Sequence, residues 1–156
     1  MDFIPFSMKQ LWWKLLGALM VIYSVIAGML IEVPALNILN ESIRNLFYHV
    51  PMWFAMIALL VGSTVYSIGY LVKPVPSRDI RAAEITRTAI FLGILGLVTG
   101  MVWAQYTWGR FWTNDPKLNA AAVGLLIYFA YFILRGSFSD DQQKAKISAI
   151  YNILAF

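Results

Sequence analysis

The sequence predicts an all-α protein that crosses a membrane several times. Its 156 residues are 60% hydrophobic and 13% charged, and the mean hydropathy is +0.69. Soluble proteins average about 45–50% apolar and about 25% charged residues. The apolar residues also form four runs near the roughly 20 residues that a membrane-spanning helix needs. We therefore expect one integral membrane domain over residues 1–156, a transmembrane helical bundle with four full spans and a partial fifth.

The first two spans follow from the first half of the chain. One apolar run covers about 11–31 and opens with a tryptophan pair and Lys14, which suit the membrane–water boundary. A polar connection follows, and the next apolar run covers about 46–72. Prolines and charged residues after it predict a loop that lasts until a third span begins.

The second half of the chain repeats this alternation. The third span is expected at about 85–103, and an aromatic connection over 104–118 separates it from a fourth span at about 118–134. A charged connector leads to a final apolar run, 147–156, of about half the spanning length. An interfacial stub would explain that run, but it has no terminating signal, which favours a span that is interrupted part-way.

The basic residues are distributed unequally between the two sides of the membrane. The N-terminal side receives nine of the twelve Lys and Arg residues, and the other side receives Arg44, Arg110 and Lys117. Because basic loops stay in the cytoplasm, we expect a cytoplasmic N-terminus and an outer face that carries the aromatic connection. The net charge of +4 then reflects topology, and the expected partner is a lipid bilayer rather than nucleic acid.

Cysteine and histidine usage limits the possible chemistry. The chain has no cysteine, which excludes disulfides and thiolate metal sites, and its single histidine, His49, excludes a multi-histidine metal cage. Pro51 suits the first turn of a helix, so His49 is expected at the mouth of the second span, at the membrane–water boundary. Taken alone, it fits an interfacial histidine bonded to water or a carbonyl better than an axial metal ligand; both interpretations remain open.

The aromatic connection has two interpretations of equal weight. Trp108, Phe111 and Trp112 are spaced i, i+3, i+4, which would place them on one face if the segment were helical. Together with Arg110 and Lys117 they would form an apolar platform edged with positive charge, suited to a flat amphiphilic ligand with carboxylates. A belt of aromatic residues at the membrane interface would use the same side chains.

Other residues near this connection suit structural roles. Asp115 followed by Pro116 matches the N-cap and first position of a helix. Gly93, Gly96 and Gly100, within the third span, are spaced for close helix packing.

With these residues identified, the chain resembles the haem-handling membrane proteins of cytochrome c maturation, the CcmC/CcsA family. The segment WGRFWTNDPKLN at 108–119 is similar to the family's tryptophan-rich signature, W-G-x-W-W-x-W-D-x-R-L-T, and YHVP at 48–51 is similar to its His-Val-Pro segment. Phe111 and Asn114 stand where the signature has tryptophan, and Lys117 where it has arginine. Phe111 keeps an aromatic ring but Asn114 loses one, which implies a smaller platform.

The resemblance implies a b-type haem that is bound transiently at the outer face and delivered for cytochrome c maturation. In the family two outer histidines are the axial ligands; His49 matches the first, and this chain lacks the second. Carried over by position, His49 is the metal ligand. The haem-contacting set is His49, Trp108, Gly109, Arg110, Phe111, Trp112, Asp115 and Lys117.

The implied role is haem handling rather than enzymatic turnover, with lyase-like transfer only together with partners. Those partners are a haem chaperone of cytochrome c maturation, the ABC-transporter subunits of the maturation complex and a small membrane subunit. The implied location is the inner (cytoplasmic) membrane, with the tryptophan-rich loop on the periplasmic side. The alternative function is a non-catalytic membrane scaffold or a permease-like subunit of a transporter complex.

Overall fold

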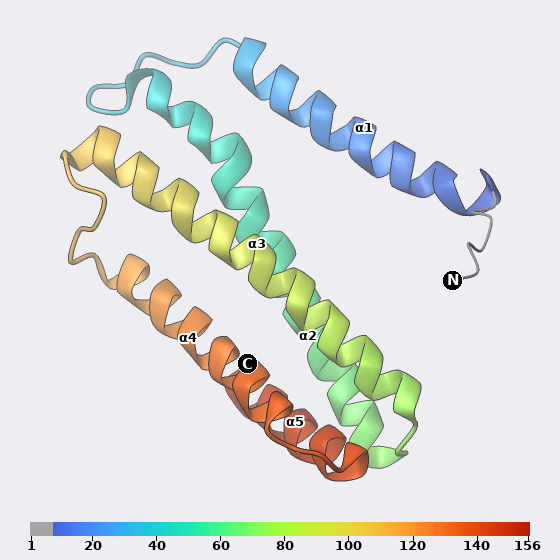
Figure 1. Ribbon diagram of the computed structural model, residues 1–156. Helices are drawn as coiled ribbons and strands as arrows, with labels where there is room; N and C mark the ends of the chain where they lie inside the picture. Colours follow the sequence, from blue (N-terminus) through green and yellow to red (C-terminus); the bar gives the residue numbers. More distant parts are fainter. Residues whose placement is uncertain (1–7) are drawn as a thin grey trace.

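A computed structural model describes residues 8–156, and their side chains from residue 11 onward. Within that part of the chain, all regular structure is helical (Figure 1), which confirms the predicted all-α fold. The helices are α1 (Met8–Leu30), the 3-10 helix η1 (Asn40–Asn45), α2 (Leu46–Val72), α3 (Pro76–Trp108), α4 (Pro116–Gly136) and α5 (Asp141–Ala155).

Four segments are long and apolar enough to cross a membrane, as predicted. They are Leu11–Leu30, Asn40–Val72, Pro76–Trp108 and Pro116–Gly136. α5 has 15 residues, fewer than the roughly 20 that a spanning helix needs.

Two helices extend well beyond the spans expected from hydropathy. α3 begins at Pro76 rather than near 85, because proline suits the first helical position and Asp79 lies in the first turn, near the positive end of the helix dipole. α5 begins at Asp141, within the predicted connector, and the Asp140 side chain caps it by accepting from the backbone N–H of Gln143 at 2.6 Å. Hydropathy detects the apolar part of a helix and misses these charged ends.

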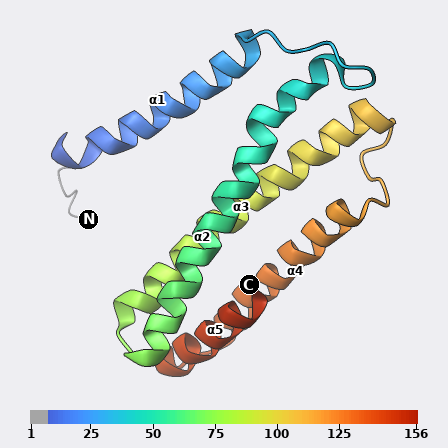
Figure 2. The ribbon, with the colours of Figure 1, turned by 180° about the vertical axis from the view of Figure 1, so that it is seen from behind.

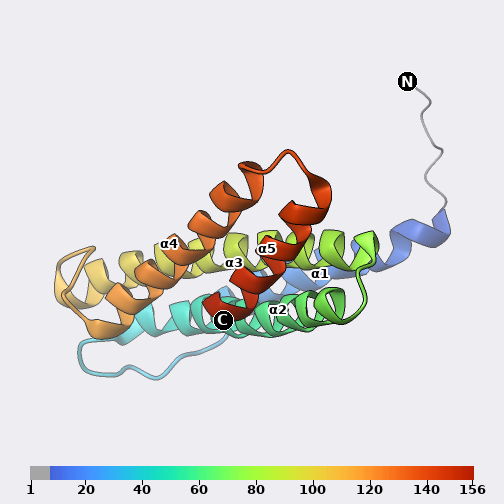
Figure 3. The ribbon, with the colours of Figure 1, turned by 90° about the horizontal axis from the view of Figure 1, so that it is seen from below.

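α2 and α3 form a long antiparallel pair at the centre of the molecule (Figures 1 and 2). α4 and α5 lie on one side of this pair (Figure 3), and α5 packs against both α2 and α4. α1 diverges from α2 along most of its length (Figures 1 and 2). The two approach each other near the carboxyl end of α1, where the Tyr48 hydroxyl donates to the Val25 carbonyl at 3.0 Å.

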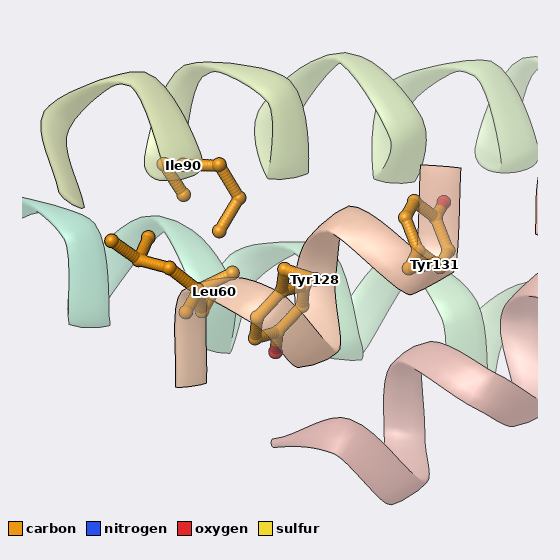
Figure 4. Close-up of a cluster of buried hydrophobic side chains, with 6 residues drawn as sticks. Leu60, Ile90, Tyr128 and Tyr131 are labelled. Atoms are coloured by element: carbon orange, nitrogen blue, oxygen red, sulfur yellow. The ribbon is translucent and has the colours of Figure 1, made fainter. Parts of the chain in front are cut away.

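The core lies where α2, α3 and α4 meet. Leu60, Ile90, Tyr128 and Tyr131, labelled in Figure 4, are buried together there. A Cβ added at Gly93 would lie 2.6 Å from Met56 Sδ and 2.8 Å from Leu125 Cδ2, so this glycine lets α2 and α4 approach α3 closely.

Two sets of polar contacts join helices of the bundle. Arg135, in the last turn of α4, donates to both carboxylate oxygens of Asp79 on α3, at 2.7 and 2.6 Å. The buried amide of Asn152 on α5 donates to the hydroxyls of Ser63 and Ser67 on α2, each at 2.8 Å.

Candidate functional site

A cavity of about 640 Å³ opens between α2, α3 and the start of α4, near the end of the bundle that carries the connection 109–115. Cofactor sites usually enclose about 300–1,000 Å³, so this one has room for a ligand of that class. Its lining is mostly apolar and aromatic. The lining residues are Leu39, His49, Trp53, Ile57, Gly96, Leu97, Gly100, Trp103, Ala104, Thr107, Trp108, Thr113, Asp115, Lys117, Leu118 and Ala121.

His49 belongs to the helical wall of this cavity. The 3-10 helix η1 runs directly into α2, which begins at Leu46. Pro51 therefore lies inside the helix and not in its first turn. The expectation that Pro51 lies in the first turn of the helix is wrong, whereas His49, the fourth residue of α2, does lie in that first turn.

Side chains from two helices hold the imidazole of His49. Its Nδ1 lies 3.1 Å from the Thr99 hydroxyl oxygen on α3. Trp53 and Trp103 contact the ring edge-on, with centroids 6.2 and 5.9 Å away and interplanar angles of 76° and 74°. The imidazole therefore has a defined orientation, because Thr99 of α3 is within hydrogen-bond distance of one ring nitrogen and two indoles pack against the ring.

The glycines of α3 make room for these side chains. A Cβ at Gly96 would lie 2.9 Å from Trp53 Cε2, and a Cβ at Gly100 would lie 2.8 Å from His49 Cε1. The predicted close packing at these glycines is confirmed. At Gly96 and Gly100 this close packing leaves space for the side chains of Trp53 and His49, which line the cavity.

The connection between α3 and α4 is not helical. α3 ends at Trp108, because Gly109 adopts a left-handed conformation (φ 72°) that ends the helix and favours glycine. The condition for a shared face is therefore not met, and Trp108, Phe111 and Trp112 do not lie on one helical face.

The structure divides the predicted site residues into two groups. His49, Trp108, Asp115 and Lys117 line the cavity. The remaining four lie along the exposed connection beside it and are not among the lining residues: Gly109, Arg110, Phe111 and Trp112.

Asp115 has the predicted structural role. Its carboxylate accepts from the backbone N–H groups of Lys117 at 2.7 Å and Leu118 at 3.2 Å, and Pro116 takes the first helical position. This N-cap fixes the start of α4, which places Lys117 and Thr113 at the cavity beside it.

The sequence-based site left out Trp53, Trp103 and Thr99. Trp53 could have been found from helical spacing. His49, Trp53 and Ile57 are four residues apart in the sequence, so they share one face of a helix. Trp103 and Thr99 come from α3, and their proximity to His49 depends on how α2 and α3 are aligned. No local pattern encodes that alignment.

Comparison with known proteins supplies the family. The family model described as "Heme exporter protein C" matches residues 1–156. Heme exporter protein C of Bradyrhizobium diazoefficiens is 27% identical over 116 residues, which are 74% of this chain and 44% of the relative. Its namesake in Haemophilus influenzae is 21% identical over 155 residues, 94% of this chain and 63% of the relative.

A second group of relatives carries a different name. Cytochrome c biogenesis protein CcsA of Prochlorococcus marinus is 35% identical over 92 residues, 56% of this chain and 30% of the relative. The chain spans about half the length of the curated Heme exporter protein C relatives that it matches. From the match over its whole length and its four apolar helices, the chain belongs to the Heme exporter protein C family of multi-pass membrane proteins.

Proposed function

We propose that this chain binds haem as cargo in the cavity between α2, α3 and α4, and holds it for delivery to cytochrome c maturation. One observation carries the proposal: the only histidine of the chain lines an apolar cavity walled by tryptophans. The names of the relatives, which refer to haem export and cytochrome c biogenesis, support the choice of cargo.

The available metal ligands favour a metal that arrives within a macrocycle. Among residues 8–156, no group of three or more His, Asp or Glu side chains could hold a metal ion. The porphyrin of haem supplies its own equatorial nitrogens, so the protein need provide only axial ligands. His49 is the residue that would serve as one of them.

The remaining lining suits an amphiphilic planar ligand. Trp53, Trp103 and Trp108 offer apolar faces and edges to the flat surface of a porphyrin. Lys117 at the cavity, with Arg110 on the adjacent connection, would pair with the propionate carboxylates.

The other residues of the connection would act around the ligand. The turn at Gly109 redirects the chain after Trp108, and Asp115 fixes the start of α4. Phe111 and Trp112, exposed by 55% and 40%, would extend the aromatic surface beside the cavity.

We also propose the topology and partners that such a role needs. The excess of basic residues on one side favours a cytoplasmic N-terminus in the inner membrane, with the cavity towards the periplasm. The chain would take part in haem handling without catalysing a reaction itself. It would pass haem to a haem chaperone, together with ABC-transporter subunits and a small membrane subunit.

The test is a haem titration of the purified protein in lipid nanodiscs, followed by the Soret band. We expect saturable binding that His49→Ala weakens about tenfold or more, and that added imidazole partly restores in His49→Gly. Phe54→Ala is the matched control on the same helix, because Phe54 is 72% exposed. Equal affinity in the wild type and in His49→Ala would contradict the proposal.

The scaffold alternative makes a different prediction in the same titration. If haem occupies the cavity, Trp108→Leu weakens binding more than Trp112→Leu, because only Trp108 of this pair lines it. A scaffold with an aromatic belt predicts that neither change alters haem binding.

A further inference from the structure

The hydroxyl of Thr99 lies at the centre of a small hydrogen-bond group behind His49. Thr99 Oγ1 is 2.8 Å from the Leu95 carbonyl oxygen and 3.0 Å from the Gly96 carbonyl oxygen, both on α3. It is also 3.1 Å from Nδ1 of His49 on α2. One hydroxyl thus faces two carbonyls and one ring nitrogen.

The number of donors and acceptors in this group determines which ring nitrogen of His49 is protonated. A hydroxyl has one proton to donate, and a carbonyl can only accept. Threonine in a helix commonly donates to the carbonyl four residues earlier, and here that carbonyl, on Leu95, is also the nearest acceptor. The Thr99 oxygen then offers a lone pair to His49, so Nδ1 must be the protonated nitrogen.

We propose that Thr99 is a positioning residue: it holds His49 in the Nδ1–H tautomer and thereby leaves the lone pair of Nε2 free to bind iron. The assignment of the tautomer stands on the hydrogen bonds alone, and only its use for iron rests on the proposed function. Metal-binding histidines generally donate their second ring N–H to an oxygen acceptor, which fixes tautomer and orientation.

The surroundings of Thr99 make it suited to this role. The Asn45 side chain, at the end of η1 and one turn before His49, donates to the Thr99 backbone carbonyl at 3.1 Å. Thr99 is therefore joined twice to the continuous segment formed by η1 and α2, through Asn45 and through His49. The indoles of Trp53 and Trp103 restrict rotation of the ring away from the hydroxyl.

The single histidine makes the tautomer directly measurable. Protein labelled with ¹⁵N-histidine has only two labelled ring nitrogens, so their NMR signals need no residue assignment. In haem-free protein at about pH 8, where imidazole is neutral, we expect Nδ1 to show a one-bond N–H coupling and Nε2 to show none.

Two variants at position 99 test the role of the hydroxyl. Thr99→Val keeps the shape of the side chain but removes the acceptor, and should shift the population towards the Nε2–H tautomer. Thr99→Ser keeps the hydroxyl and should retain Nδ1–H. A wild-type protein with protonated Nε2 would overturn the assignment. A Thr99→Val protein that keeps Nδ1–H would overturn the positioning role of Thr99, because an acceptor other than the hydroxyl would then hold this tautomer.

A haem titration of the same variants links the tautomer to binding. Loss of a hydrogen bond to a ligating histidine typically costs about 10–100-fold in metal affinity, so we expect roughly tenfold weaker binding for Thr99→Val and near wild-type binding for Thr99→Ser. If the tautomer is Nδ1–H but neither the wild-type protein nor any variant binds haem, the proposed function fails and the tautomer assignment stands. If binding depends on His49 while Nε2 carries the proton, the positioning role fails and the proposed function stands.

Discussion

The environment of His49 depends on single positions of α3. Thr99 contacts its Nδ1, Trp103 packs on its ring, and Gly100 leaves the space that the ring occupies. The sequence predicted His49 as a possible ligand and the N-cap role of Asp115, because a rare residue type and an Asp–Pro pair are local signals. The contacts from α3 could not be predicted, since they depend on the alignment of two helices.

Gly100→Ala should displace the imidazole. The added Cβ would lie 2.8 Å from His49 Cε1 and 3.4 Å from Nδ1, and overpacking of this kind typically costs about 1–3 kcal/mol. We expect haem affinity to fall about tenfold in the nanodisc titration. Gly62→Ala on α2 is the matched control, because a Cβ there meets no atom within 4 Å; an equal effect of both changes would argue against displacement of the ring.

At the scale of the helices, hydropathy predicted the number and order of the spans but not where the helices end. α3 continues through charged residues after Pro76 and stops only at Gly109, because helix formation depends on backbone hydrogen bonds and caps as well as on apolarity. The spacing of Trp108, Phe111 and Trp112 would have placed three aromatic rings on one face if this segment were helical. A single left-handed glycine prevents that, and the spacing rule had not taken it into account.

Asn152 should control how firmly α5 is attached. Its amide is fully buried and donates to Ser63 and Ser67 on α2; interhelical hydrogen bonds in membrane proteins contribute about 0.6 kcal/mol on average and up to about 1.7 kcal/mol. We expect Asn152→Ala to speed hydrogen–deuterium exchange of the α5 amides several-fold and to leave α4 nearly unchanged. Leu154→Ala, at a position on the same helix that is 81% exposed, should have little effect, and similar exchange in both variants would refute this account.

At the scale of the whole molecule, the ion pair between Arg135 and Asp79 joins the end of α4 to the start of α3. The two side chains are only 17% and 13% exposed, and their bidentate geometry is the strong form of this interaction. The pair is formed by residues 56 positions apart, so counting basic residues along the sequence assigned Arg135 to one side of the membrane without identifying its partner.

Removing one partner of this pair should destabilise the bundle. Arg135→Ala leaves the Asp79 carboxylate mostly buried and unpaired; because some solvent reaches it, we expect a loss below the roughly 3–5 kcal/mol of a fully buried pair. Thermal unfolding in detergent should show a lower midpoint, which the charge exchange Asp79→Arg with Arg135→Asp partly restores. Arg87→Ala is the control: its pair with Glu84 is 66% and 59% exposed and should contribute about 1 kcal/mol or less. An equal loss in both variants would contradict the proposed difference.

The length of α3 has a consequence for the depth of the cavity. An exposed charge such as that of Arg87 is costly within hydrocarbon, so Arg87 lies near one surface of the bilayer. At 1.5 Å per residue, Trp108 is about 32 Å further along the helix, close to the roughly 30 Å thickness of the hydrocarbon layer. Gly100, and with it the ring of His49, then lies about 12 Å below the level of Trp108. The imidazole is therefore at the depth of the hydrocarbon layer, and a ligand must reach well below the level of Trp108 to contact it.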